Sequence, residues 1–192
     1  AVFALSADGE YLQVLDGAGY LVHPWCEARA LKLARVSQRH AVRVAEIQAR
    51  MHWLELDSSI PKSQSPSLPL EKNIEVLVDF AEGYHIELAD VLRRGLPAFR
   101  DIAQRQPESA AALEAHLVIS HGDLDQKNVL WDDSDNPWLI DWECARWMNP
   151  THEALMQALN WSGVVGEFSP AVFKAFIAAY RQAGGHIDNQ HL

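Results

Sequence analysis

The sequence has few cysteines and no long apolar run, and these absences argue against several classes of protein. Only two of the 192 residues are cysteine, Cys26 and Cys144, and they do not form a CxxC pair. A disulfide scaffold or a cysteine-based zinc site is therefore not expected. No stretch approaches the ~20 uncharged apolar residues of a membrane span, and no basic-then-apolar leader is visible. We expect a cytoplasmic protein with reduced thiols and no membrane segment.

Basic residues are also scarce. Sixteen Lys and Arg stand against 26 Asp and Glu, which gives a formal net charge of −10. A protein that binds phosphate backbones needs the opposite sign, and the tryptophan cluster at 131–147 contains one basic residue, Arg146. We therefore expect no nucleic-acid partner. The negative charge suits a cationic small molecule or simply good solubility, and charge alone favours the second.

The length predicts one domain, or a domain and a fraction. The first 23 residues are expected to form short strands, because apolar runs alternate with the turn signals Asp8-Gly9 and Asp16–Gly19 and stop at Pro24. Further short strands are predicted at 117–119, 129–131 and 138–140, and a surface loop at 58–69. Helices are predicted at 30–56, at 70–104 with breaks near Gly83 and at 95–97, from 107 to about 117, at 151–162 and at 169–183.

The densest group of polar residues surrounds the hairpin predicted at 129–140. Asp123 and Asn128 are five positions apart on the loop that enters it, and Asp141 ends the partner strand 13 residues after Asn128. A hairpin of this length returns the end of its second strand to the start of its first. Asn128 and Asp141 are therefore predicted to share one hard cation, and Mg²⁺ needs only one or two carboxylates beside substrate phosphates. Glu143 is a candidate for a second carboxylate beside that cation, although a structural hydrogen-bonding role is favoured.

These motifs resemble those of the aminoglycoside phosphotransferase and choline kinase group. The resemblance lies in His121-Gly122-Asp123, the Asn at five residues, and Ile140-Asp141-Trp142-Glu143. The segment 20–27 is similar to the strand and hinge that join the two lobes of such proteins, and His52 stands where they often carry Leu-His. The resemblance covers nearly the whole chain.

The resemblance implies an α+β, protein-kinase-like fold, represented mainly by its helical C-terminal lobe. A small antiparallel sheet would remain from the N-terminal lobe. Residues 1–28 would be the last strands of the nucleotide lobe and the hinge, and residues 29–192 the helical catalytic and substrate lobe.

The resemblance also implies roles for individual residues. Asp123 would accept or orient the proton of the attacking hydroxyl, and His121 would brace the catalytic loop. Asn128 and Asp141 would hold Mg²⁺ against the phosphates of ATP. Backbone groups of the hinge, at Pro24, Trp25 and Cys26, would face the adenine.

The implied activity is ATP- and Mg²⁺-dependent transfer of the γ-phosphoryl group to a hydroxyl of a small molecule, with a cationic acceptor among the candidates. An aminoglycoside is the first expectation, and choline, ethanolamine, homoserine or a sugar stay open. The acids at 71, 75, 79, 82, 87 and 90 are expected to form mostly a solvated face, although some could hold ammonium groups.

The sequence departs from the family in one respect. It contains no glycine-rich loop and no strand lysine ahead of the hinge, since Lys32 comes after it. The chain also opens at Ala1 without Met. We therefore expect little activity from these residues without an N-terminal portion. The alternative is a non-catalytic binding domain that retains only this lobe. A protein kinase is not favoured, because Ile140–Glu143 replaces Asp-Phe-Gly.

Overall fold

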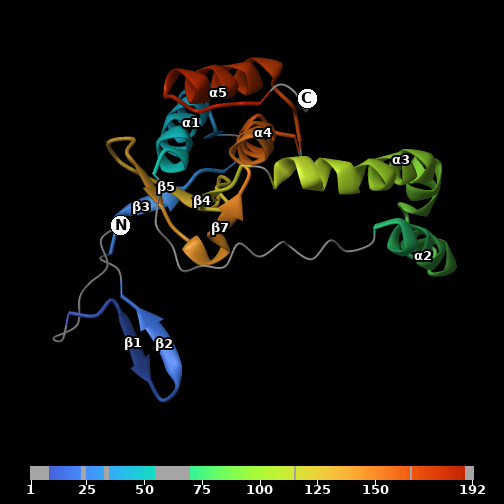
Figure 1. Cartoon of the computed structure of the whole chain (residues 1–192), viewed down its shortest axis with the longest axis horizontal. Helices are drawn as coiled ribbons and strands as arrows, with labels where there is room; N and C mark the ends of the chain where they lie inside the picture. Colours follow the sequence, from blue (N-terminus) through green and yellow to red (C-terminus); the bar gives the residue numbers. More distant parts are fainter. Residues whose placement is uncertain are drawn as a thin grey trace. The chain divides into compact units, whose positions relative to one another are not determined.

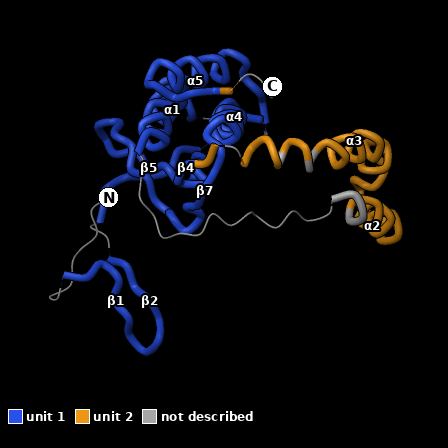
Figure 2. The backbone as a smooth tube through the Cα atoms, in the orientation of Figure 1, with its two compact units in different colours: residues 1–55, 118–187 blue, residues 56–117, 188–192 orange. Residues whose placement is uncertain are grey.

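The computed structural model describes residues 9–22, 25–32, 35–54, 70–114, 116–164 and 166–188 (Figure 1). The strand expected ahead of the turn at Asp8-Gly9 and the loop expected at 58–69 lie outside the described residues. The chain divides into two compact units, residues 1–55 with 118–187, and residues 56–117 with 188–192 (Figure 2). Within the described residues, no helix is both long and apolar enough to cross a membrane.

An antiparallel hairpin of β1 (Leu12–Leu15) and β2 (Ala18–Leu21) confirms the predicted N-terminal turn. Only Asp16 and Gly17 form the turn, and both have positive φ, 51° and 78°. This is the backbone of a type I′ turn, whose twist matches that of the flanking strands. The turn is therefore shorter than the four residues predicted, and Ala18 and Gly19 belong to the second strand.

Three helices form the core of the first unit: α1 (Gln38–His52), α4 (Pro150–Trp161) and α5 (Pro170–Gln182). They pack pairwise against one another and bury Val44, Trp161 and Phe176 almost completely. The predictions for α4 and α5 are confirmed to within one residue at each end. Asn149 accepts hydrogen bonds from the first turn of α4, and Ser169 accepts one from the first turn of α5.

The prediction of a helix from Ala30 is wrong. Residues Ala28–Ala30 form strand β3, which pairs with β5, and the helix starts at Gln38. Ser37 precedes that start, and its N–H donates to His40 Nδ1 at 3.1 Å, which satisfies a backbone donor outside the helix. Strand pairing with a distant segment thus decides the conformation of residues whose local pattern also suits a helix.

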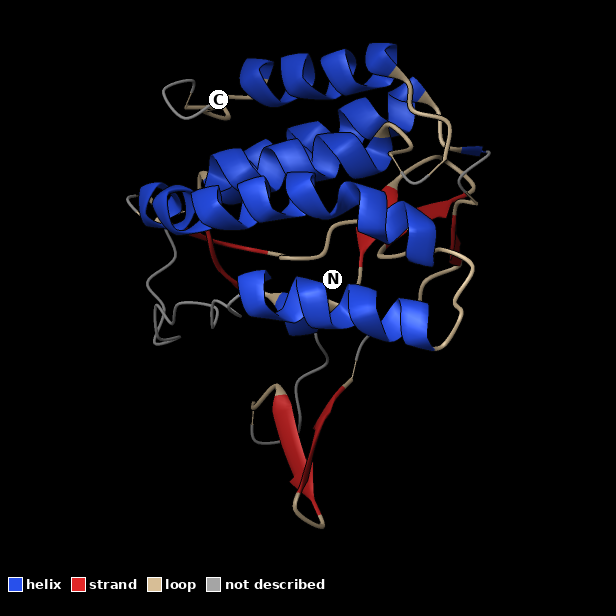
Figure 3. Cartoon of the chain, turned by 90° about the vertical axis from the view of Figure 1, so that its right-hand side faces the viewer, coloured by secondary structure: helices blue, strands red, loops and turns tan. Residues whose placement is uncertain are grey.

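Two small sheets complete this unit. β3, β5 (Val129–Asp132) and β6 (Pro137–Leu139) form one, in the order β3-β5-β6, and β4 (Val118–Ser120) pairs with β7 (Arg146–Met148) in the other. Both sheets are antiparallel, with Val129 opposite Leu139 and Ser120 opposite Arg146. The predicted strands at β4, β5 and β6 are confirmed, and β7 was not predicted. Helices predominate over strands in the described residues (Figure 3).

The second unit contains α2 (Leu70–Gly83) and α3 (Ala89–Leu113), which pack against each other. The predicted break near Gly83 is confirmed. The breaks predicted at 95–97 and at Pro107 are wrong, because α3 continues through both. An interior proline removes one helical hydrogen bond and crowds the preceding turn, and the other hydrogen bonds of the 25-residue helix offset this cost.

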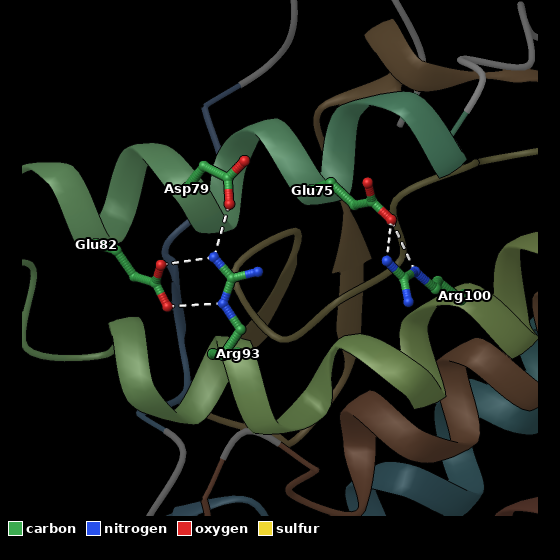
Figure 4. A network of polar contacts seen from close by, with 5 residues as sticks. All are labelled: Glu75, Asp79, Glu82, Arg93 and Arg100. Carbon is green, nitrogen blue, oxygen red and sulfur yellow. Dashed lines mark hydrogen bonds and ion pairs between the residues drawn. The ribbon is translucent and has the colours of Figure 1, made fainter.

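Ion pairs link α2 to α3 (Figure 4). Arg93 contacts Asp79 and Glu82, at 2.6 Å in each case, and Arg100 contacts Glu75. The expectation of a mostly solvated acidic face is confirmed, since Glu75, Asp79 and Glu82 are exposed. Each of these three carboxylates also has an arginine partner in the facing helix.

Candidate active site

Residues 121–128 form the loop between β4 and β5, and this loop brings Asp123 and Asn128 together. The Asn128 side chain is nearly fully buried, and its Nδ2 donates to the Asp123 backbone oxygen at 2.7 Å and to Asp123 Oδ2 at 3.0 Å. The Asn128 N–H donates to the oxygen of Asp125 at 3.2 Å, which closes a tight turn. The five-residue spacing seen in the sequence therefore corresponds to direct contact.

The hairpin returns Asp141 to the same end of the sheet. Ile140, the residue before it, donates its N–H to the Asn128 oxygen at 3.1 Å. Asp141 itself adopts a left-handed conformation, φ 64° and ψ 57°, and starts the short 3₁₀ helix Trp142–Cys144. A non-glycine residue in this region is uncommon, and such positions cluster at functional sites. The register that places Asp141 near Asn128 agrees with the expectation from spacing.

His121 links the loop to the end of β6. Its side chain is fully buried, and Nε2 donates to the oxygen of Ile140 at 2.8 Å. The ring also packs against Trp142, with 4.6 Å between ring centroids. His121 therefore links the start of the loop to Ile140, the residue before Asp141.

Gly122 occupies a position that only glycine fits. Its φ is +79°, and a Cβ there would lie 2.2 Å from the backbone oxygen of Cys144. Both the backbone conformation and the close approach of Cys144 exclude a side chain. The glycine of the His-Gly-Asp motif thus allows β7 and the preceding 3₁₀ helix to pack against the loop.

A buried polar network lies behind this loop, and the sequence reasoning did not find it. Glu153 of α4 accepts from the Gly122 N–H at 3.0 Å through Oε1, and its Oε2 lies 2.7 Å from His52 Nε2. The other ring nitrogen of His52 lies 2.7 Å from the hydroxyl of Tyr180, and Ser120 Oγ lies 3.1 Å from Nε2. Through His52, Glu153 and Tyr180, helices α1, α4 and α5 thereby join one network that holds the loop. The signal in the sequence was a carboxylate on the apolar face of α4, which also carries Ala154, Gln157, Ala158 and Trp161.

Glu153 is charged despite its burial. Burial opposes ionisation, but the hydrogen bonds from His52, Ser120 and Gly122 and the charge of His52 outweigh it, so the pKa of the Glu153 carboxyl is lowered. Burial raises the pKa of the Tyr180 phenol, and the negative charge of Glu153 raises it further. His52 Nε2 donates to the Glu153 carboxylate, and His52 Nδ1 is hydrogen-bonded to the Tyr180 hydroxyl at 2.7 Å.

Lys127 is a second residue that the sequence reasoning missed. Its Nζ lies 3.0 Å from Asp123 Oδ2 and 3.3 Å from Asp125 Oδ2. Hydrogen bonds to Asp123 and then to Asp125 raise the pKa of the Lys127 ammonium group. A lysine in a polar loop gave no signal in the sequence, because only the fold shows which carboxylates it reaches.

The contacts described above do not join the residues expected to face the adenine, at 24–26, to the rest of the candidate site. Pro24 lies outside the described residues. Trp25 is 86% exposed and donates through Nε1 to Glu27, while the Cys26 oxygen accepts from Ala28 at the start of β3. In the described part of the chain, no hydrogen bond or ion pair joins Trp25 or Cys26 to Asn128 or Asp141.

The donor set at the loop suits a hard cation. Asn128 Nδ2 is engaged by Asp123, which leaves the amide oxygen as the group of Asn128 for a ligand, and Asp141 contributes an exposed carboxylate. Amide and carboxylate oxygens are ligands of Mg²⁺. Glu143 is exposed and makes no hydrogen bond or ion pair with the residues described, so its expected hydrogen-bonding role is not supported. Among those residues there is also no cluster of three or more His, Cys, Asp or Glu side chains suited to a metal.

Comparison with solved structures identifies the class of fold. Spectinomycin phosphotransferase APH(9)-Ia in complex with ADP and spectinomycin superposes with a TM-score of 0.66 at 14% identity, over 97% of this chain and 58% of that one. The Plasmodium vivax ethanolamine kinase gives a TM-score of 0.56 at 15% identity, over 89% and 52%. A choline kinase from Cryptosporidium parvum gives 0.51 at 15% identity, over 86% and 56%. The fold is therefore the protein-kinase-like fold of these enzymes, and the chain spans just over half of their length.

The sequence itself defines the family. The model of the phosphotransferase enzyme family (APH) matches residues 2–188. This chain belongs to that family. A search of curated proteins found no match.

Proposed function

We propose that this chain is the catalytic lobe of a phosphotransferase that moves the γ-phosphoryl group of ATP to a hydroxyl of a small molecule. The observation that carries the proposal is the double hydrogen bond from Asn128 to Asp123 in a loop whose hairpin returns Asp141 beside it. Family membership and the fold support it. Phosphoryl transfer requires mainly positioning and charge neutralisation, so a few fixed polar side chains suffice.

Asp123 would accept the proton of the acceptor hydroxyl as the acceptor oxygen attacks the γ-phosphorus. Asn128 fixes the Asp123 carboxylate, and His121 braces the loop through Ile140 and Trp142. Asn128 and Asp141 would hold Mg²⁺, which when bound neutralises charge on the phosphates. The same proposal includes a lobe boundary near residue 28, adenine contacts at Pro24, Trp25 and Cys26, and a cytoplasmic location.

The acceptor we propose first is an aminoglycoside-type antibiotic. The solved relatives include an enzyme described as a spectinomycin phosphotransferase, which gives the highest TM-score of the three compared. Enzymes described as ethanolamine and choline kinases also share the fold, so amino alcohols form the second arm of the test. The negative charge of the chain suits cationic acceptors of either kind.

The test measures Mg²⁺-dependent ADP release from ATP across aminoglycosides, choline, ethanolamine, homoserine and sugars. It uses the 192-residue chain and any longer form that its reading frame encodes, because a glycine-rich loop and a strand lysine are not in this sequence. We expect one acceptor class to stimulate ADP release in a form that supplies those parts, and little activity from the 192 residues alone.

Asp123→Asn and Asp125→Asn form a matched pair of variants. Both remove one carboxylate from the same loop, but only Asp123 contacts Asn128 through its side chain. We expect Asp123→Asn to abolish acceptor-stimulated release and Asp125→Asn to lower it only in part, because the asparagine Oδ1 still accepts the Lys127 N–H. ATP binding without any transfer, in every form and with every acceptor, would favour the non-catalytic binding domain instead.

A further inference from the structure

We propose that Lys127 is a positioning residue for Asp123, selecting which carboxylate oxygen receives the proton of the acceptor hydroxyl. The inference rests on the proposed phosphoryl transfer and adds a residue to it. Lys127 Nζ and Asn128 Nδ2 both lie 3.0 Å from the same oxygen, Asp123 Oδ2. Within the described residues, the hydrogen bond to the Asp123 carboxylate and the closest approach of the Lys127 ammonium group are both at Oδ2.

The loop itself directs Lys127 back over Asp123. Asp125 Oδ1 accepts the backbone N–H of Lys127 at 2.9 Å, and the Asp125 backbone oxygen accepts the N–H of Asn128 at 3.2 Å. Such an Asx turn reverses the chain within three residues. Asp125 Oδ2 then lies 3.3 Å from Lys127 Nζ, so the same aspartate holds both ends of the lysine.

The contact is too exposed to serve mainly for stability. The side chain of Lys127 is 64% exposed, while those of Asp123 and Asp125 are 35% and 24% exposed. Ion pairs of exposed lysines contribute little to folding, because solvent screens the charges and ordering the long side chain costs entropy. The position of the ammonium group on the proposed catalytic carboxylate therefore points to a role in the reaction.

Lys127 and Asn128 together leave a single oxygen of Asp123 for the acceptor. In the transfer step the acceptor oxygen bonds to the γ-phosphorus, and the bond from that phosphorus to the bridging oxygen breaks. The electron pair of the broken bond leaves with ADP, and the hydroxyl proton passes to Asp123 Oδ1. With Oδ2 held by two donors, the carboxylate is fixed in rotation as well as in position, which favours a reactive geometry.

The test compares Lys127→Met, Lys127→Arg and the control Lys174→Ala in a form of the protein that transfers phosphate. Lys174 is an exposed lysine of α5. We expect Lys127→Met to lower kcat about tenfold to a hundredfold, as the loss of a side chain that orients a ligating carboxylate does, with the KM for ATP and thermal unfolding unchanged. Lys127→Arg restores most of the lost rate because it keeps the charge, and Lys174→Ala behaves as wild type.

The possible outcomes distinguish a failure of the role proposed for Lys127 from a failure of the proposed phosphoryl transfer. A wild-type protein that transfers phosphate, with Lys127→Met equally active, overturns the role of Lys127 alone. A rise in the KM for ATP at unchanged kcat also overturns it, because that would assign Lys127 to phosphate binding. A wild-type protein without transfer in any form overturns the proposed function, and the role of Lys127 falls with it.

Discussion

The carboxylate of Glu153 accepts a hydrogen bond from the backbone N–H of Gly122 at 3.0 Å, and so joins helix α4 to the loop that carries Asp123. The second oxygen of Glu153 lies 2.7 Å from His52, which in turn contacts Tyr180. One buried charge therefore connects the packing of three helices to the geometry of the candidate active site. Changes in this network are expected to alter stability and activity together.

Glu153→Gln should lower both the stability of the protein and its activity. The amide can still accept from Gly122 through its oxygen, but its NH₂ group would face the nitrogen of His52, which needs an acceptor. A buried donor left without its partner costs about 1 to 3 kcal/mol in the free energy of unfolding. Urea unfolding measures this loss, and acceptor-stimulated ADP release from the same preparation should decrease with it.

The effect of Glu153→Gln should depend on pH. The pKa of the Glu153 carboxyl in the folded protein is lowered from its ordinary value of 4.5. Its stabilising contribution is therefore fully present above that value and is lost as the pH falls through the lowered pKa. The difference in unfolding free energy between wild type and variant should be large at about pH 7 and shrink below about pH 4. A difference that stays constant down to about pH 3 would contradict an ionised Glu153 in the folded state.

Gly122→Ala should disrupt the loop through two effects, backbone strain and a steric clash with Cys144. The residue has φ +79°, and the new Cβ would lie 2.2 Å from the oxygen of Cys144, a backbone atom that cannot move aside easily. We expect loss of acceptor-stimulated ADP release and a lower midpoint of urea unfolding. Gly122→Asn is the informative comparison, because asparagine tolerates positive φ but carries the same Cβ. Recovery in the asparagine variant would show that backbone strain, rather than the contact with Cys144, sets the requirement for glycine.

Local patterns predicted much of the fold, and tertiary contacts decided the rest. The helix at 170–182 and the hairpin turn at Asp16-Gly17 follow from capping and turn residues that act over a few positions. The continuity of α3 does not follow from them, because local rules place breaks at its glycine and prolines. The start of α1 was missed for a related reason, since β3 pairs with a strand about a hundred residues further along the chain.

The candidate site shows the same division. Asp123, Asn128 and Asp141 were predicted from spacing, and the structure brings the first two into contact. Glu153 was not predicted, because its partner His52 is 101 positions away and neither residue belongs to the polar loop. A charged residue on the apolar face of a predicted helix is the general signal that such a buried pair leaves in a sequence.

Arg93→Met should loosen the packing of α2 on α3. Arg93 contacts Glu82 and Asp79 of the facing helix, and these hydrogen bonds raise the pKa of its guanidinium group (Figure 4). We expect faster amide hydrogen exchange along α2 in the variant, and a smaller difference from wild type at high salt, because the groups are exposed. Arg94→Met is the control, since the neighbouring Arg94 makes no ion pair with the residues described. Equal exchange in both variants would show that the ion pairs do not hold the two helices together.

Tyr180→Phe should destabilise the protein without changing the volume of its core. The Tyr180 hydroxyl lies 2.7 Å from His52 Nδ1 at a fully buried position, so phenylalanine leaves that ring nitrogen without a partner. The expected loss is about 1 to 3 kcal/mol in the free energy of unfolding, measured by urea denaturation. Tyr84→Phe is the matched control, because Tyr84 is 70% exposed, and it should leave the midpoint unchanged. His52 also carries the contact to Glu153, so the rate of phosphoryl transfer should fall in Tyr180→Phe but not in Tyr84→Phe. A stable, fully active Tyr180→Phe protein would mean that Glu153 holds the loop without support from α5.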